Sequence, residues 1–342
     1  MLMFLKNKQF WGGLTAIALL AICLNGVELE EIKQLSKRLD FIWLIPATIA
    51  SALFQIFRGL RWRLIISQQT PMPLVQGISL YSAGQVLNIV MPVLTGQVGR
   101  MILFARKANL RKTVVFSTIV MEIVFDAAGL IIFLLLTSVA FAIPSNYRSV
   151  SYMLVAVTVA MLATLYLILH YQLQLEEVGR KHMRSRWPGV YITLKKFLRS
   201  FIKGIDLLRS SQHVVGSLAY SLISWIFHVL AVYFLFLAFG FDLPFAVAAA
   251  VMIINTIVLM VPITPGNAGT FEIAVSTSLT AFSIGRSDAV LFAMALHLID
   301  LLPIMALGLT YVHYQKISLS EIKRQHSEEV IFDKISEDGT LI

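Results

Sequence analysis

The chain has 342 residues, of which 58% are hydrophobic and only 14% are charged, and its mean hydropathy is +0.79. This composition excludes an ordinary soluble domain and predicts an all-α polytopic membrane protein. The net charge of +9 is explained by basic loops that face anionic lipid, so no nucleic-acid partner is expected. The single cysteine, Cys23, lies in an apolar segment and is expected to be a small core residue.

Six apolar segments are predicted to be membrane helices, at roughly 20 residues per span. They cover residues 10–25, 41–63, 113–141, 150–171, 212–240 and 289–313. The first follows a short basic start with no small-residue cleavage site, so we expect a retained helix. Two further apolar regions, 74–107 and 244–284, each contain a central Pro/Gly cluster and are predicted to be helical hairpins.

The second arm of the first hairpin, residues 97–107, is expected to be re-entrant. Its length gives a rise of about 16 Å, which is too short for a ~30 Å hydrocarbon core. A hairpin crosses either twice or not at all, so the orientation of later spans does not depend on this question. With both termini in the cytoplasm, 23 of the 28 basic residues fall on the cytoplasmic side, as charge bias favours.

This topology divides the chain into two membrane halves, residues 1–171 and 204–315. A basic cytoplasmic loop, 172–203, separates the halves, and a polar cytoplasmic tail, 316–342, follows the second. The first hairpin has both ends in the cytoplasm and the second has both ends outside. Two repeat units, about 41–141 and 212–313, are therefore predicted to be inverted relative to each other.

The two Pro/Gly clusters share the spacing P-x3-G-x2-G, so one constant offset along the chain relates them. They consist of Pro92, Gly96 and Gly99 in the first half, and Pro262, Gly266 and Gly269 in the second. Matched broken helices in inverted halves favour a binding site at the membrane midplane. The alternative is that these residues only kink two packed helices.

Polar residues near the clusters form the predicted substrate pathway. Helices that restart after Gly96, and after Thr264 as N-cap with Pro265 at the first position, would offer free N–H groups to a phosphate. Arg100 and Glu272 suit a zwitterionic headgroup or could pair with each other. The full set is Gln85, Asn88, Pro92, Gly96, Gln97, Gly99, Arg100, Asn255, Pro262, Thr264, Pro265, Gly266, Asn267, Gly269 and Glu272.

Other ionisable residues lie within predicted spans, where they are functional candidates. Glu122 and Asp126 share one helical face, and Asp126 corresponds to Asp300 in the repeat with a four-residue insertion. No nucleophile accompanies these acids, so a proton relay that includes His297, or a buried ion pair, fits better than catalysis. The same segments also contain His228, expected to be a helix-packing residue, and Arg58 and Arg61, expected to collect phosphate headgroups or to snorkel. No metal-site or P-loop pattern is present, so no cofactor is expected.

The motifs that run from Asn88 to Arg100 and from Pro265 to Glu272 resemble those of the flippase-like family named after the transmembrane region of lysylphosphatidylglycerol synthase. The family patterns resemble N-x3-P-x3-G-E-x2-R and P-G-G-x-G-x2-E, and this chain has Gln97 and Asn267 at two of the positions. The resemblance covers about residues 5–315. It implies lipid translocation in a bacterial inner membrane, with relatives that handle aminoacylated phospholipids or polyprenyl-phosphate sugars.

The resemblance does not extend to the soluble synthase domain, so no enzymatic activity is expected. The leading hypothesis is a translocase for a phosphate-headed lipid such as an aminoacyl-phospholipid or a polyprenyl-phosphate sugar. Two alternatives stay open: a lipid-modifying membrane transferase, and a non-catalytic partner subunit of a glycosyltransferase or lipid synthase that docks through the basic loop.

Overall fold

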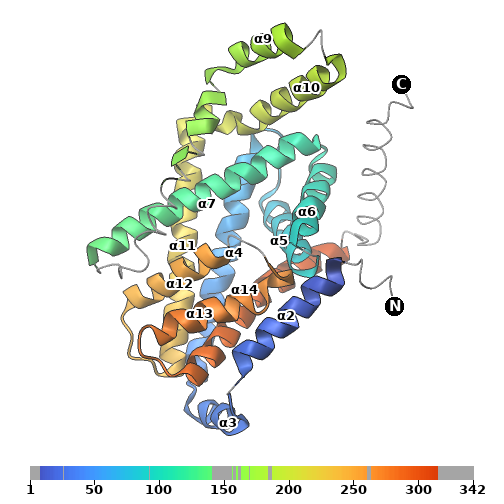
Figure 1. Ribbon diagram of the computed structural model, residues 1–342. Coiled ribbons are helices and arrows are strands. Elements are labelled where there is room, and N and C mark those ends of the chain that lie inside the picture. The colour runs from blue at the N-terminus through green and yellow to red at the C-terminus, as the bar shows by residue number, and fades with distance from the viewer. Residues whose placement is uncertain are drawn as a thin grey trace. The chain divides into compact units, whose positions relative to one another are not determined.

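The computed structural model describes residues 8–25, 27–91, 93–140, 156, 159–160, 163–168, 170–183, 187–259 and 263–314, and within these residues every regular element is helical (Figure 1). The prediction of an all-α polytopic membrane protein is therefore confirmed. Pro92, Pro262 and the predicted tail, together with half of the predicted span 150–171, lie outside the described residues.

Four helices in the described residues are long and apolar enough to cross a membrane. They are α4 (Leu44–Ser67), α7 (Lys112–Ala140), α11 (Ser211–Phe239) and α14 (Arg286–Tyr314). A 3-10 turn at Phe41–Trp43 precedes α4. Shorter apolar helices are α2 (Lys8–Leu24), α5 (Leu74–Val90) and α12 (Phe245–Leu259). The first predicted span corresponds to α2, which has only 17 residues.

The remaining helices are shorter or more polar. They are α3 (Leu29–Arg38), α6 (Val93–Ala108), α9 (Gln172–Met183), α10 (Pro188–Ile205), α13 (Thr270–Thr280) and two 3-10 turns at Asp206–Arg209 and Pro265–Asn267. The predicted basic loop thus contains two helices.

The chain forms two compact units. The first unit comprises Met1–Gln55, Ser79–Phe104 and Phe227–Ile342, and the second comprises Ile56–Ile78 and Ala105–Ile226. The unit boundaries fall inside α4, α5, α6 and α11, so each of these helices contributes to both units. The division into two halves along the sequence stays a prediction.

The first unit is built around α13, which packs against α14, α12 and α2. Phe292 of α14 contacts the rings of Phe236, Phe239 and Phe241, with centroid distances of 5.2, 5.2 and 5.7 Å. Gly308 allows α14 to approach α5, because a Cβ there would lie 2.7 Å from the backbone oxygen of Ser82. This close contact places α14 beside the first hairpin.

The second unit is built around the contact of α10 with α7. Its core includes Met121 and Phe125 of α7 and Phe201 and Ile205 of α10. Helix α9 is attached to α10 by a bidentate ion pair, in which Arg199 donates to the two carboxylate oxygens of Glu176 at 2.6 and 2.7 Å. Bidentate geometry of this kind fixes both side chains.

Helix boundaries repeat between the two halves of the chain. The helical segment that begins at Phe41 is matched by α11, which begins at Ser211, and this offset is the one that relates the two Pro/Gly clusters. Helix α7, from Lys112, is matched by α14, from Arg286, and both helices have 29 residues. The offset between this second pair of helices is larger by four positions, which equals the insertion inferred from the sequence.

The expected helix starts near the Pro/Gly clusters need correction. Helix α6 begins at Val93, not after Gly96, and its 16 residues give a rise of about 24 Å, which is still less than a ~30 Å core. In the second cluster only a 3-10 turn starts at Pro265, and α13 starts at Thr270. Gly96 therefore lies inside a helix and does not free backbone N–H groups for a ligand.

Candidate functional site

The two broken regions meet inside the first unit. Helix α5 ends at Val90, and Ile89 in its last turn contacts Gly266 of the second break: a Cβ on Gly266 would lie 3.3 Å from Ile89 Cγ2. Gly266 has φ of +60°, a left-handed conformation that glycine adopts without strain. The structure thus places two helix breaks against each other, and the substrate pathway stays a prediction.

The second break carries its own capping groups. The Thr264 hydroxyl donates to the carbonyl of Ala268 at 2.8 Å, so it bridges the ends of the 3-10 turn. Gly269 has φ of +84° and donates its N–H to Glu272 Oε2 at 2.7 Å. Because Glu272 already supplies a negative group to the start of α13, this terminus differs from the open phosphate site expected from sequence.

Glu272 and His297 form a buried pair between α13 and α14. His297 Nδ1 lies 2.7 Å from Glu272 Oε1, and His297 Nε2 lies 3.1 Å from the carbonyl oxygen of Gly266. The imidazole ring stacks on Phe271 with a centroid distance of 4.4 Å. His297 and Gly269 thus contact the two carboxylate oxygens of Glu272, and a pairing of Glu272 with Arg100 stays a prediction.

Arg100 is buried in the first hairpin, with 2% of its surface exposed. Its guanidinium lies 5.0 Å from the ring centroids of both Tyr81 and Phe104, a cation–π arrangement. Gly84 of α5 faces Phe104 and the Arg100 side chain, which lets α5 and α6 pack closely. A buried cation therefore lies within the hairpin.

The amide residues of the predicted pathway are not all in one environment. Asn88 donates to Gln85 Oε1 at 3.0 Å on the partly exposed face of α5, and Asn255 is buried in α12. Gln97, which takes the place of the acidic residue of the family pattern, is exposed. The structure thus separates Gln97 from the buried members of the set.

Asp300 is bound by two polar groups in the first unit. Ser51 of α4 donates to Asp300 Oδ1 at 3.0 Å, and His228 Nε2 of α11 lies 3.1 Å from Asp300 Oδ2. The His228 ring stacks on Phe54 with a centroid distance of 4.3 Å. His228 is thus both a packing residue, as expected, and the partner of an intramembrane acid, which was not expected.

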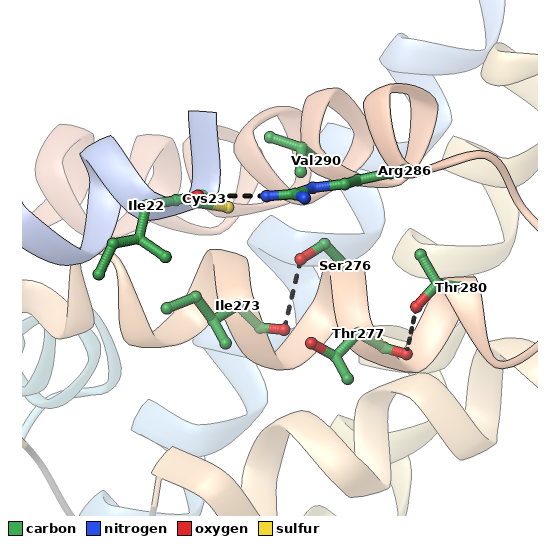
Figure 2. Close-up of a pocket in the computed structure, with 8 residues that line it drawn as sticks. All are labelled: Ile22, Cys23, Ile273, Ser276, Thr277, Thr280, Arg286 and Val290. Atoms are coloured by element: carbon green, nitrogen blue, oxygen red, sulfur yellow. Dashed lines mark hydrogen bonds between the residues drawn. The ribbon is translucent and has the colours of Figure 1, made fainter. Parts of the chain in front are cut away.

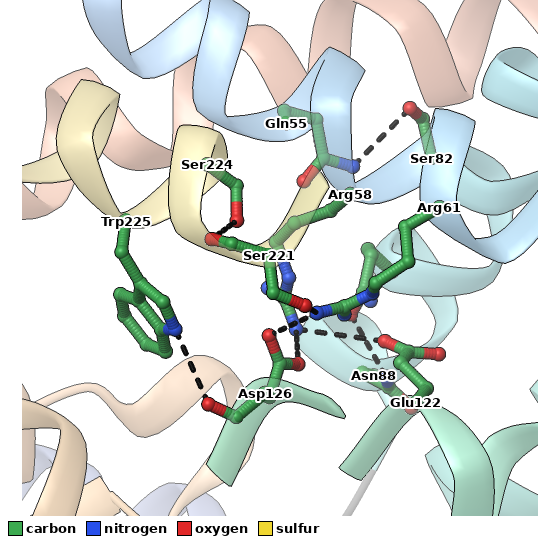
Figure 3. Close-up of polar contacts among 11 residues, drawn as sticks. Gln55, Arg58, Arg61, Ser82, Asn88, Glu122, Asp126, Ser221, Ser224 and Trp225 are labelled. Atoms are coloured by element: carbon green, nitrogen blue, oxygen red, sulfur yellow. Dashed lines mark hydrogen bonds and ion pairs between the residues drawn. The ribbon is translucent and has the colours of Figure 1, made fainter. Parts of the chain in front are cut away.

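A separate ion cluster lies in the second unit (Figure 3). Asp126 accepts from Arg61 at 2.6 Å and from Arg58 at 3.1 Å, and Arg58 also lies 3.5 Å from Glu122. Among the residues that the structure describes, two arginines and two acidic side chains form this cluster. The Arg61 side chain has no exposed surface, so the snorkelling interpretation is wrong for this residue.

Two further side chains complete this cluster. Arg61 donates to the Ser221 hydroxyl at 2.8 Å, and the Trp225 indole donates to the backbone carbonyl of Asp126 at 3.2 Å. The buried ion pair expected for the intramembrane acids is therefore present at Asp126, which pairs with Arg58 and Arg61. A headgroup-collecting role for Arg58 and Arg61 stays a prediction.

Sequence reasoning missed Ser51, Ser221 and the role of His228, although a signal was present. Ser221 is related to Ser51, and His228 to Arg58, by the same offset that relates the two Pro/Gly clusters. The repeat thus extends into the first helix of each half: Arg58 contacts Asp126 and His228 contacts Asp300, while Ser51 donates to Asp300 and Ser221 accepts from Arg61.

A pocket of about 240 Å³ lies beside α13 in the first unit (Figure 2). Its lining combines apolar side chains with the hydroxyl of Ser276 and the guanidinium of Arg286, which donates to the carbonyl of Ile22 at 3.4 Å. Cys23 also lines it, with only 5% of its surface exposed. No residue predicted for the substrate pathway lines this pocket.

The chain matches the lysylphosphatidylglycerol synthase TM region family over residues 9–308. A UPF0104 membrane protein of Pyrococcus horikoshii is 22% identical over 333 residues, which cover 92% of this chain and 99% of the relative. A UPF0104 membrane protein of Methanothermobacter thermautotrophicus is 28% identical over 115 residues, 34% of each chain. No solved structure matches the chain.

Proposed function

Because the chain belongs to the family of the lysylphosphatidylglycerol synthase transmembrane region, we propose that this multi-pass membrane protein is a lipid translocase. Its cargo is a phosphate-headed lipid such as an aminoacyl-phospholipid or a polyprenyl-phosphate sugar. The headgroup passes the paired helix breaks while the acyl or prenyl chains stay in the bilayer.

The contact of Ile89 with Gly266 is the observation that supports this proposal most. Irregular backbone is tolerated at membrane depth only where protein or a polar cavity satisfies its polar groups. Two breaks of matched spacing that touch each other are typical of transporter sites built from repeats. A single kinked helix would explain neither the matched spacing nor the contact.

Buried charge near the breaks supports a headgroup with a phosphate. Arg100 is held inside the first hairpin, and a guanidinium binds phosphate oxygens through paired N–H groups. Arg, Asp and Glu within membrane segments carry a desolvation cost that function commonly justifies. Arg100 is therefore our assigned headgroup contact.

The topology that accompanies this function is an inverted repeat with re-entrant hairpins. The repeated helix boundaries support two structurally equivalent halves, and the basic-residue bias supports cytoplasmic N and C termini in a cell membrane. Because the two halves are equivalent in structure but opposite in orientation, they can exchange conformations, and this exchange opens the binding site alternately to the two sides of the membrane.

The test is a vesicle assay with fluorescently labelled phosphatidylglycerol as the probe. Arg100→Gln should lower the rate of probe movement about 10- to 100-fold, which corresponds to the loss of one charged hydrogen bond of about 1.5–3 kcal/mol. Arg106→Gln, a change on the same helix outside the proposed contact, serves as the matched control. Circular dichroism and gel filtration check that both variants fold.

Equal rates for wild type and Arg100→Gln would remove Arg100 from the pathway, and a wild-type rate equal to that of protein-free vesicles would refute translocation of this probe. Native mass spectrometry of gently purified protein identifies the retained lipid. Formation of a new lipid product by purified protein in detergent would favour the transferase alternative.

A further inference from the structure

Equivalent carboxylates in the two halves have cationic partners of different chemistry. Asp126 is bound by Arg58, and its repeat equivalent Asp300 is bound by His228, which lies at the position equivalent to Arg58. An arginine guanidinium keeps its proton at every physiological pH, whereas a histidine changes charge between about pH 5 and pH 8. One carboxylate is thus permanently neutralised, and the other has a partner that can titrate.

A second titratable pair lies one helical turn away from Asp300. Glu272 contacts His297, and positions three apart on a helix lie on the same face, so His297 and Asp300 share one face of α14. The positions equivalent to Glu272 and His297 in the first half are Ile102 and Ile123. The second half alone therefore carries both His–carboxylate pairs among these repeat-related positions.

The hydrogen bonds of His297 require an additional proton. Nδ1 contacts a Glu272 carboxylate oxygen and Nε2 contacts the Gly266 carbonyl, and both of these partners are acceptors when Glu272 is ionised. A neutral imidazole has only one N–H, so it can donate to only one of them. The 2.7 Å distance to Glu272 fits a charge-assisted hydrogen bond from an imidazolium.

We propose that the two pairs, His228–Asp300 and His297–Glu272, are a proton-binding site that couples lipid movement to a proton gradient. This inference rests on the proposed translocase function and names its energy source. The arginine-bound carboxylate Asp126 is then a fixed structural counterpart and does not release protons. Proton binding, and not a proton relay through Glu122, is thus the proposed role of His228, Asp300, His297 and Glu272.

The geometry links proton binding to the helix breaks. Loss of the second ring proton from His297 leaves either Glu272 Oε1 or the Gly266 carbonyl without a donor. Gly266 is the residue that packs on Ile89 where the two breaks meet. Proton release therefore weakens a hydrogen bond at that contact, and proton binding restores it.

The surroundings contain other charged or titratable groups. The elements packed against α13 and α14 in this unit, together with α14 itself, also carry Cys23, Glu30, Glu31, Lys33, Lys37, Arg38, Tyr81, Arg100, Tyr233, Arg286, Asp288, Tyr311, His313 and Tyr314. Arg38 pairs with Asp288 at 3.4 Å, and Arg286 donates to the Ile22 carbonyl. Cys23 is buried and lines the pocket beside α13.

The first test counts protons directly, without cargo. Ring ¹⁵N NMR of histidine-labelled protein in nanodiscs, with signals assigned through His228→Gln and His297→Gln, reports the protonation of each ring. We expect both rings to change their protonation state across the pH range in which the protein stays folded. Rings that keep one protonation state throughout this interval would overturn the proton site, whether or not lipid moves.

The second test imposes a gradient of one pH unit across vesicles that contain labelled phosphatidylglycerol. Coupling of one proton per lipid allows up to about tenfold accumulation of the probe in one leaflet. Glu272→Gln mimics the protonated acid, because its amide can donate to His297 and its oxygen can accept from Gly269. This variant should not accumulate the probe in either leaflet.

His228→Arg copies the permanent cation of the first half and should abolish accumulation in the same way. His313→Gln, on the exposed last turn of α14, is the matched control and should accumulate probe like wild type. Probe movement by wild type that ignores the gradient overturns the coupling but leaves the translocase function. No movement at all refutes the translocase function, and the NMR titration then decides the proton site.

Discussion

Asp126→Asn tests whether the ion cluster of the second unit holds this part of the fold together. The substitution leaves Arg61, which has no exposed surface, with the neutral Ser221 hydroxyl and without its carboxylate at 2.6 Å. Removal of one member of a buried pair costs about 3–5 kcal/mol, because the other charge stays buried without compensation. We expect a loss of this size in the free energy of unfolding.

Arg61→Met should cost less, about 1–3 kcal/mol, because Arg58 stays 3.1 Å from a carboxylate that is 20% exposed. The double variant should cost less than the sum of the single variants, since it removes both members of one interaction. Unfolding is measured by titration of sodium dodecyl sulfate into detergent micelles, with helicity followed by circular dichroism.

Asp242→Asn provides the matched control for the loss of one acid, because Asp242 lies between α11 and α12, outside the cluster. Its effect should stay within about 0.5 kcal/mol. The reasoning is refuted if Asp126→Asn is no more damaging than this control, or if the Asp126→Asn and Arg61→Met effects are additive.

Two further predictions follow from local geometry. Gly269→Ala should lower the free energy of unfolding by about 2–4 kcal/mol, because φ at Gly269 is +84° and the new Cβ would overlap Leu19. Gly285→Ala is the control: its Cβ would meet nothing within 4 Å, so its free energy of unfolding should stay near the wild-type value in the same titration. The hydrogen bond from Arg199 holds the pKa of Glu176 below its usual 4.5. The stabilisation that this ion pair gives to the contact between α9 and α10 is therefore fully present above pH 4.5 and is lost as the pH falls through the lowered pKa. Hydrogen-exchange protection factors of α9 in the wild type should therefore fall on acidification. The Glu176→Gln variant should show weaker protection at neutral pH and no such fall. Wild-type protection that does not change in acid would contradict the assignment.

The sequence predicted the helices well where hydropathy alone decides their extent. Helices α7, α11 and α14 agree with their expected spans within a few residues, because long apolar runs leave no other stable structure in a bilayer. Helix α4 was expected to end near residue 63 but continues to Ser67. Its arginines Arg58 and Arg61 have carboxylate partners on α7, so they do not mark the end of a span.

Partners of the buried charges were harder to predict than their positions. The i, i+4 spacing of Glu122 and Asp126 indicated one shared face, but no local pattern identifies Arg61 as the cation that pairs with Asp126 across 65 residues of chain. Local capping was also missed: Glu272 lies three residues after Gly269, which is the spacing of a capping interaction.

The ion cluster has a consequence for how the protein is made. Helix α4 has the lowest mean hydropathy of the four long helices, 1.5 against 2.0 for α7, and each arginine near the centre of an isolated helix adds about 2.5–3.5 kcal/mol to the cost of insertion. Its carboxylate partners emerge from the ribosome only with α7, so we expect the arginine-bearing end of α4 to wait at the membrane interface until α7 arrives. Insertion measured by glycosylation of truncated nascent chains would show this as a gain in α4 insertion once α7 is included.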